Sequence, residues 1–195
     1  MDRNKIRDFF NRLAPEWDAN MVRNDEIINT ILENVHVEEG CDVLDVACGT
    51  GVLIPDYLKR NVRSVTGIDL SEKMIEIARA KFEADDRVTL VCDDVTEHAF
   101  EHQFDSIIVY NALPHFEDPE TLIRVLSGLL RKGGYLTIAH GASRDSINRH
   151  HSNVSSDLKK ELPPIEELTE MMSRYLEVTV AISDERMYQA AGCKK

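Results

Sequence analysis

The residues with the clearest chemical potential lie in one short segment, residues 45–51, which reads Asp-Val-Ala-Cys-Gly-Thr-Gly. Gly49 and Gly51 carry no side chain, so the backbone can approach a ligand there more closely than other residues allow. A segment with the pattern of a helix follows, and the free N–H groups at a helix start attract ligand oxygens. The segment therefore predicts a turn that cradles a small ligand.

Three features around this turn decide which ligand it suits. A dinucleotide fingerprint requires a third glycine, and the residue at that place is Ile54. Asp45 would repel a pyrophosphate, but it suits a ligand that carries a cationic amino group. Asp69 stands twenty residues after Gly49, where a carboxylate can accept hydrogen bonds from both hydroxyls of a ribose. The pattern disfavours a nicotinamide-dependent oxidoreductase.

The elements that must position these residues alternate along the chain. From residue 42 onward, short apolar runs alternate with amphipathic segments, which is typical of a doubly wound α/β fold with a parallel sheet. We expect Ser71 to cap one helix and Gly133 to follow the end of another. The expected strands are 43–47, 64–68, 87–92, 105–110 and 135–139, with a closing hairpin at 176–183 and 186–191. The expected helices are 5–13, 25–35, 51–60, 71–82, 119–131 and 165–175.

The length of 195 residues suits a single domain, and we expect that domain to have four parts. Residues 1–40 form a helical cap, and residues 41–140 form the ligand-binding core. Residues 141–164 are a long polar connection or lid, and residues 165–195 supply the closing helix and hairpin.

Four of the seven histidines stand near the expected ligand crevice. His115 follows the fourth core strand, His140 ends the fifth, and His150 and His151 lie in the long connection. A neutral imidazole there could act as a general base, because ligands bind at the carboxyl ends of such strands. Each histidine also has a structural interpretation, as a packed ring or as part of a solvated lid. In a third interpretation they converge on a divalent metal, although no ligand spacing supports it.

The composition excludes some partners. Asp and Glu number 35 and Lys and Arg number 23, which gives a net charge of -12. Nucleic acids and anionic membranes attract Lys and Arg, so both are disfavoured as partners. No apolar run approaches the ~20 residues of a membrane span. The four cysteines lack metal-like or disulfide-like spacing, so we expect reduced thiols in a cytoplasmic protein.

Five motifs, in their order along the chain, carry a resemblance to a known protein family. They are residues 45–51, the turn 68–71 with Met74, the acidic pair 93–94, the segment 104–111, and Leu-Arg-Lys-Gly-Gly at 130–134. Their order and spacing resemble those of class I S-adenosylmethionine-dependent methyltransferases over about residues 40–140. Residues 9–18 resemble the leader of the branch that includes the ubiquinone and menaquinone biosynthesis methyltransferases. The resemblance implies a seven-stranded Rossmann-like sheet with helices on both faces and an N-terminal helical cap.

The resemblance also implies roles for the residues of these motifs. Asp45 and the backbone of the turn would hold the methionine end of S-adenosylmethionine, and Asp69 would bind the ribose. Ala47 stands where the family has the first glycine of the turn. The implied cofactor-binding residues are Asp45, Ala47, Cys48, Gly49, Gly51, Asp69, Leu70, Met74, Asp93, Asp94, Val95, Asn111 and Ala112. The implied activity is methyl transfer by in-line displacement.

The acceptor is expected to be a small molecule, because neither the cap nor the connection is large enough for an RNA- or protein-recognition domain. Residues 144–160 hold four basic side chains against two acidic ones, which favours an anionic acceptor. Phe9, Phe10 and Trp17 form either a lid over it or the core face of a helix. Two alternatives stay open, namely a non-catalytic S-adenosylmethionine-binding protein and a metal-containing variant that uses the histidines.

Overall fold

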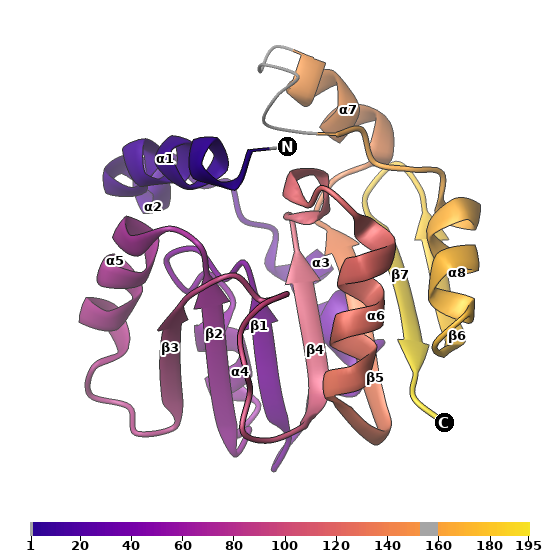
Figure 1. Ribbon diagram of the computed structural model, residues 1–195, viewed down its shortest axis with the longest axis horizontal. Coiled ribbons are helices and arrows are strands. Elements are labelled where there is room, and N and C mark those ends of the chain that lie inside the picture. Colours follow the sequence, from indigo (N-terminus) through magenta and orange to yellow (C-terminus); the bar gives the residue numbers. More distant parts are fainter. Residues whose placement is uncertain (1, 153–159) are drawn as a thin grey trace.

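A computed structural model describes residues 2–152 and 160–195, and residues 150–152 by their backbone alone. It contains a seven-stranded sheet in the order β3-β2-β1-β4-β5-β7-β6 (Figure 1). Strands β1 to β5 are parallel, and β7 runs antiparallel between β5 and β6. The strands are β1 Asp42–Val46, β2 Ser64–Asp69, β3 Val88–Cys92, β4 Phe104–Tyr110, β5 Leu130–His140, β6 Glu177–Ser183 and β7 Tyr188–Cys193. This topology confirms the predicted doubly wound α/β class.

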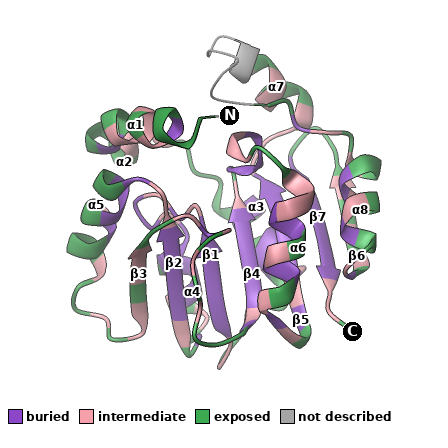
Figure 2. Ribbon diagram, viewed as in Figure 1, coloured by how far each residue is buried: buried purple, intermediate pink, exposed green. Residues whose placement is uncertain are grey.

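Helices cover both faces of the sheet. Buried side chains of α3 and α4 pack in one core cluster, and those of α6 and α8 pack in another on the opposite face. Strands β1 and β4, between these layers, are almost wholly buried (Figure 2). The helices are α1 Arg3–Leu13, α2 Trp17–Asn20, α3 Asp25–Glu33, α4 Ile54–Lys59, α5 Glu72–Phe82, α6 Pro119–Leu129, α7 Arg144–Ser152 and α8 Ile165–Ser173, with short 3₁₀ turns η1 Ala14–Glu16 and η2 Leu113–His115.

Side-chain caps fix where several helices begin. The Ser71 hydroxyl accepts the Met74 N–H at 3.2 Å, as predicted, and so starts α5 directly after β2. Asp118 accepts the N–H groups of Glu120 and Thr121 at the start of α6, where Pro119 occupies the first turn. These caps hold the segments that follow β2 and β4 close to the carboxyl edge of the sheet.

Two differences between the structure and the sequence-based prediction have a clear physical reason; the others are the short helix α2 and shifts in the bounds of other elements. The connection 141–164 contains helix α7, whose Arg144 donates to the backbone carbonyls of Leu162 and Pro163. These tertiary bonds stabilise a segment too polar to show a helical pattern. The helix predicted over 119–131 ends at Leu129, because Leu130 turns to an extended conformation and buries its side chain in β5.

A buried polar network fastens α3 to the sheet. The Gln189 amide in β7 donates to the Ile31 carbonyl and to the Thr137 hydroxyl, each at 3.1 Å. Its oxygen accepts from the Asn34 amide at 2.8 Å. Because Gln189 is fully buried, its amide relies on these three partners rather than on water for its hydrogen bonds. In the part of the chain that the structure describes, no helix is long and apolar enough to cross a bilayer.

We expect Gln189→Met to lower the free energy of unfolding by about 2–3 kcal/mol, because it fills the same volume but leaves buried polar partners unsatisfied. Urea denaturation followed by circular dichroism measures this change. Gln103→Met, at an exposed glutamine that contacts the Gly128 carbonyl, is the matched control and should leave the midpoint unchanged. Equal midpoints for the two variants would show that the network adds nothing to stability.

Candidate active site

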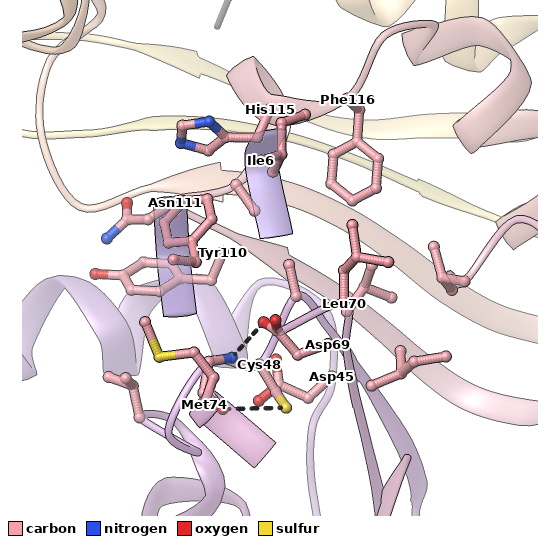
Figure 3. A pocket seen from close by; sticks show the side chains of 18 of the residues that line it. Ile6, Asp45, Cys48, Asp69, Leu70, Met74, Tyr110, Asn111, His115 and Phe116 are labelled. Carbon is pink, nitrogen blue, oxygen red and sulfur yellow. Dashed lines mark hydrogen bonds between the residues drawn. The ribbon is translucent and has the colours of Figure 1, made fainter. Parts of the chain in front are cut away.

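A pocket of about 820 Å³ opens at the carboxyl ends of β1, β2 and β4, beneath the cap formed by residues 3–23. Figure 3 shows Asp45 and Asp69 at one end of this pocket and His115 and Phe116 at the other. This edge of an open α/β sheet is where such folds bind ligands. Its volume is in the range of sites that hold a cofactor or small ligand.

The glycine turn forms the floor of the pocket. Ala47, Gly49 and Gly51 all have positive φ angles, of 54°, 56° and 79°. A Cβ at Gly51 would lie 2.5 Å from the ring of Phe82, so both backbone conformation and packing require glycine there. Ala47 adopts the left-handed conformation despite its Cβ, at a cost of about 1 kcal/mol. The substitution of the family's glycine by alanine therefore leaves the turn intact.

Asp69 at the end of β2 braces this turn from the neighbouring strand. One carboxylate oxygen accepts the Gly49 N–H at 2.8 Å, and the other accepts the Ser71 N–H at 2.8 Å. Burial raises the pKa of Asp69, and the two N–H groups oppose that shift. A carboxylate has about four acceptor positions, so Asp69 can still accept from ligand hydroxyls.

Asp45 is the most unusual group in the pocket. It is 2% exposed, and its Oδ2 has no hydrogen-bond partner among the residues that the structure describes. Its pKa is raised to about 8, mainly because of burial, with a smaller increase from the nearby Asp69 carboxylate that the Tyr57 hydroxyl opposes. A buried acceptor without a donor costs free energy. A cationic amino group of a ligand would supply the missing donor, so Asp45 fits the predicted cofactor.

Leu70, Met74, Asp93, Asp94 and Val95 also line the pocket, on the side predicted for the adenine. Met74 is buried, and Asp94 accepts from the backbone N–H and the hydroxyl of Thr96 at 2.8 and 2.7 Å. The other oxygen of Asp94 pairs with the Arg3 guanidinium at 3.0 Å. Asp93 instead contacts the His98 ring at 2.9 Å. The two residues of the predicted acidic pair therefore have different partners, and Asp94 contacts the cap through Arg3.

The far end of the pocket begins where β4 ends. Asn111 has a φ of 55°, and its side-chain oxygen accepts the Gly141 N–H at 3.0 Å, which ties β4 to the end of β5. Ala112 and Tyr110 line the wall beside it. The His115 ring meets the Phe10 ring edge-to-face, with centroids 4.9 Å apart. This end is therefore aromatic, with one imidazole facing the space.

Aromatic side chains of the cap cover the pocket. Phe10 and Trp17 both line it, and their ring centroids are 5.8 Å apart. Of the two interpretations of these aromatic residues, the structure supports a lid for Phe10 and Trp17. Tyr110 and the cap arginines Arg3 and Arg23 line the pocket as well, and no sequence pattern marks them because their neighbours come from distant segments.

Further polar contacts, besides the Arg3–Asp94 ion pair, hold the cap to the core. Asp18 binds the Thr50 hydroxyl of the glycine turn and pairs with Lys81 at 2.9 Å. The Ser71 hydroxyl donates to Asn11 at 2.6 Å. Where the cap ends, the Arg23 guanidinium donates to the buried Asp56 carboxylate at 2.6 Å. The cap is thus attached along its whole length.

The structure does not bring the described histidines His115 and His140 together, so the predicted convergence has no support among the described side chains. His140 is 2% exposed and packs against Tyr188, away from the pocket that His115 lines. His150 and His151 lie in α7, and their side chains fall outside the described residues. Among the described residues, no group of three or more His, Cys, Asp or Glu could hold a metal ion. Of the two candidates whose side chains the structure describes, His115 is the one that lines the pocket.

The basic stretch 144–160 is described only at residues 144–152 and at Lys160. No described residue of 141–164 lines the pocket. Arg144 is engaged with backbone carbonyls, and Lys160 donates to the Glu117 carbonyl. An anionic acceptor stays a prediction, but the described part of this stretch does not support it.

Comparison with known proteins agrees with this site. Residues 43–134 match the model of a methyltransferase domain family. Malonyl-[acyl-carrier protein] O-methyltransferase from Priestia megaterium is 33% identical over 132 residues, which cover 65% of this chain and 47% of that protein. A ubiquinone biosynthesis O-methyltransferase from Vibrio parahaemolyticus is 31% identical over 112 residues, with 56% and 47% covered. The chain spans about half the length of these two curated relatives.

Solved structures share the whole fold. The N-methyltransferase NodS from Bradyrhizobium japonicum, in complex with S-adenosyl-L-homocysteine, superposes with a TM-score of 0.76 at 16% identity. The match covers 97% of this chain and 98% of NodS, so the cap, the sheet and the closing hairpin follow one architecture. Residues 43–134, which carry the five ordered motifs and the glycine turn, match a methyltransferase domain, and the whole chain has the sheet expected from its resemblance to class I S-adenosylmethionine-dependent methyltransferases.

Proposed function

We propose that this protein transfers the methyl group of S-adenosylmethionine to a small-molecule acceptor bound under the cap. The observation that carries the proposal is that one pocket joins a buried carboxylate, Asp45, whose Oδ2 has no hydrogen-bond partner among the described residues, to an aromatic end that contains His115. The first feature fits the amino group of the cofactor, and the second fits an acceptor. A cytoplasmic location remains a prediction.

The cofactor would extend along the floor of the pocket. Asp45 would accept from its amino group, and Gly49 lets the backbone approach its methionine end, while Gly51, which does not line the pocket, maintains the turn by packing against Phe82. Asp69 would accept from the ribose hydroxyls, while Leu70 and Met74 offer apolar surface to the adenine. When bound, S-adenosylmethionine supplies an electrophilic methyl group on its sulfonium.

The acceptor would lie between the cofactor and the cap. Phe10, His115 and Phe116 form walls of aromatic rings, which suit a flat and largely apolar molecule. Both curated relatives described above are named O-methyltransferases, so we favour an oxygen acceptor. The His115 imidazole is the candidate that takes the hydroxyl proton as the oxygen attacks. Phe10 and Trp17 exclude water from the site.

We expect Asp69→Asn to weaken the binding of S-adenosyl-L-homocysteine by about 10- to 100-fold. The change replaces a charged acceptor with an amide, and a hydrogen bond to a charged group contributes about 1.5–3 kcal/mol. Isothermal titration calorimetry measures the dissociation constant. Asp86→Asn, at an exposed aspartate outside the pocket, is the matched control and should bind as the unaltered protein does. Unchanged binding by Asp69→Asn would remove Asp69 from the cofactor site.

We expect His115→Ala to lower the rate of methyl transfer by about 100-fold or more while the affinity for S-adenosyl-L-homocysteine changes little, because the histidine acts on the acceptor. A metabolite extract incubated with methyl-labelled S-adenosylmethionine identifies an acceptor, and single-turnover kinetics then give the rate. His102→Ala, at an exposed histidine that packs on Phe104, is the control.

Two results would contradict these roles. An unchanged rate for His115→Ala would exclude it as the base. Cofactor binding without transfer to any metabolite would instead favour the non-catalytic binding protein.

A further inference from the structure

The indole ring of Trp17 covers the glycine turn from the side of the cap. Trp17 begins α2, and its partly buried side chain lines the pocket. A Cβ placed on Gly49 would lie 3.8 Å from Trp17 Nε1 and 4.0 Å from the Met74 sulfur. Apart from the neighbours of Gly49 in the chain, no other described atom comes within 4 Å of that position. The polar edge of the indole therefore stands over this glycine.

The residue after Trp17 helps to hold the ring in this place. Asp18 binds the hydroxyl of Thr50, which is fully buried and follows that glycine in the turn. The indole also meets the Phe10 ring edge-to-face, with centroids 5.8 Å apart. Two consecutive residues of the cap thus contact two consecutive residues of the turn, which restricts where the indole nitrogen can lie.

The N–H group of this indole has no acceptor within the part of the chain that the structure describes. An indole nitrogen can donate a hydrogen bond but cannot accept one. Phenylalanine would cover the turn and pack on Phe10 without this polar group, so packing alone does not explain the nitrogen. A ligand that lies on the turn would supply the missing acceptor.

We propose that Trp17 determines cofactor specificity, because its N–H donates to the carboxylate at the amino-acid end of S-adenosylmethionine. The inference rests on the proposed function and names a further residue of the same site. In that site, Asp45 would accept from the amino group and Asp69 from the ribose hydroxyls. The cofactor carboxylate is itself only an acceptor, so it needs a donor at the methionine end, and Trp17 supplies one beside Gly49.

Three arginines of the cap also line the pocket, but their partners or positions differ. The Arg3 guanidinium pairs with Asp94 at 3.0 Å, on the side predicted for the adenine. Arg23 donates to the buried Asp56 carboxylate at 2.6 Å. Arg12 is exposed, and no atom of it lies within 4 Å of the position that the indole covers. The indole N–H is thus better placed than these cations to meet a ligand on the turn.

The test compares S-adenosylmethionine with its decarboxylated form, which keeps the amino group, the sulfonium and the nucleoside. Calorimetry on the intact chain measures the dissociation constant of each ligand. Trp17→Phe loses a hydrogen bond to a charged group, so it should bind S-adenosylmethionine about 10- to 100-fold more weakly. Its affinity for the decarboxylated form should change little, because that ligand has no carboxylate to lose.

Phe9→Leu is the matched control in the cap. Phe9 packs on Phe10, with ring centroids 5.3 Å apart, but it does not line the pocket. This variant should keep the affinities of the unaltered protein for both ligands.

A second readout needs no variant, because Trp17 is the only tryptophan of the chain. Isotope-labelled protein therefore gives a single indole N–H resonance in a proton–nitrogen correlation spectrum. S-adenosylmethionine should move this resonance downfield, since a hydrogen bond to a carboxylate deshields the proton, and the decarboxylated form should move it much less. If Trp17→Phe does not fold, this readout decides alone.

The outcomes separate this inference from the proposed function. An unchanged affinity of Trp17→Phe for S-adenosylmethionine, an equal loss for both ligands, or the same selective loss in Phe9→Leu would each overturn the role of Trp17. An indole resonance that responds equally to both ligands would do the same. In these cases S-adenosylmethionine still binds to the unaltered protein, so the proposed cofactor site stands. An absence of binding of both ligands to the unaltered protein would overturn the proposed function and this inference together.

Discussion

The burial of a carboxyl group at the end of the central strand is the constraint around which this structure is arranged. Asp45 lies in β1, with β2 on one side and β4 on the other, so water reaches it only through the pocket. An uncompensated charge there would cost several kcal/mol. The structure avoids this cost because the carboxyl group can remain neutral. The apolar strands that surround the group are well packed.

The two aspartates of the pocket illustrate how position decides chemistry. Asp69 already accepts two backbone N–H groups and so helps to hold the glycine turn in its left-handed conformations. Asp45 makes no such bond through Oδ2 and has that oxygen available for a ligand. The Asp69 carboxylate thus stabilises the turn before any ligand binds. The Oδ2 atom of Asp45, in contrast, gains a hydrogen-bond donor when a ligand binds.

Much of this site could be predicted from the sequence, because its parts are local. The glycine turn, the Ser71 cap and Asp69 depend on short spacings along two consecutive β–turn–α segments, and the structure places them as expected. The roles of His140 and of helix α7 could not be predicted in the same way. Strand order brings the ends of β4 and β5 together, but alternation along β5 decides on which face a side chain emerges, and it sends His140 to Tyr188.

The positions of the two chain ends have a practical consequence. Arg3 lines the pocket and pairs with Asp94. Lys195 lies beyond the end of β7, near the amino ends of the parallel strands and so away from the pocket (Figure 1). The antiparallel insertion of β7 produces this separation, since a seventh parallel strand would have ended beside the pocket. An affinity handle or a fluorophore fused after Lys195 therefore stays remote from the ligand, while one fused before Arg3 would sit at its entrance.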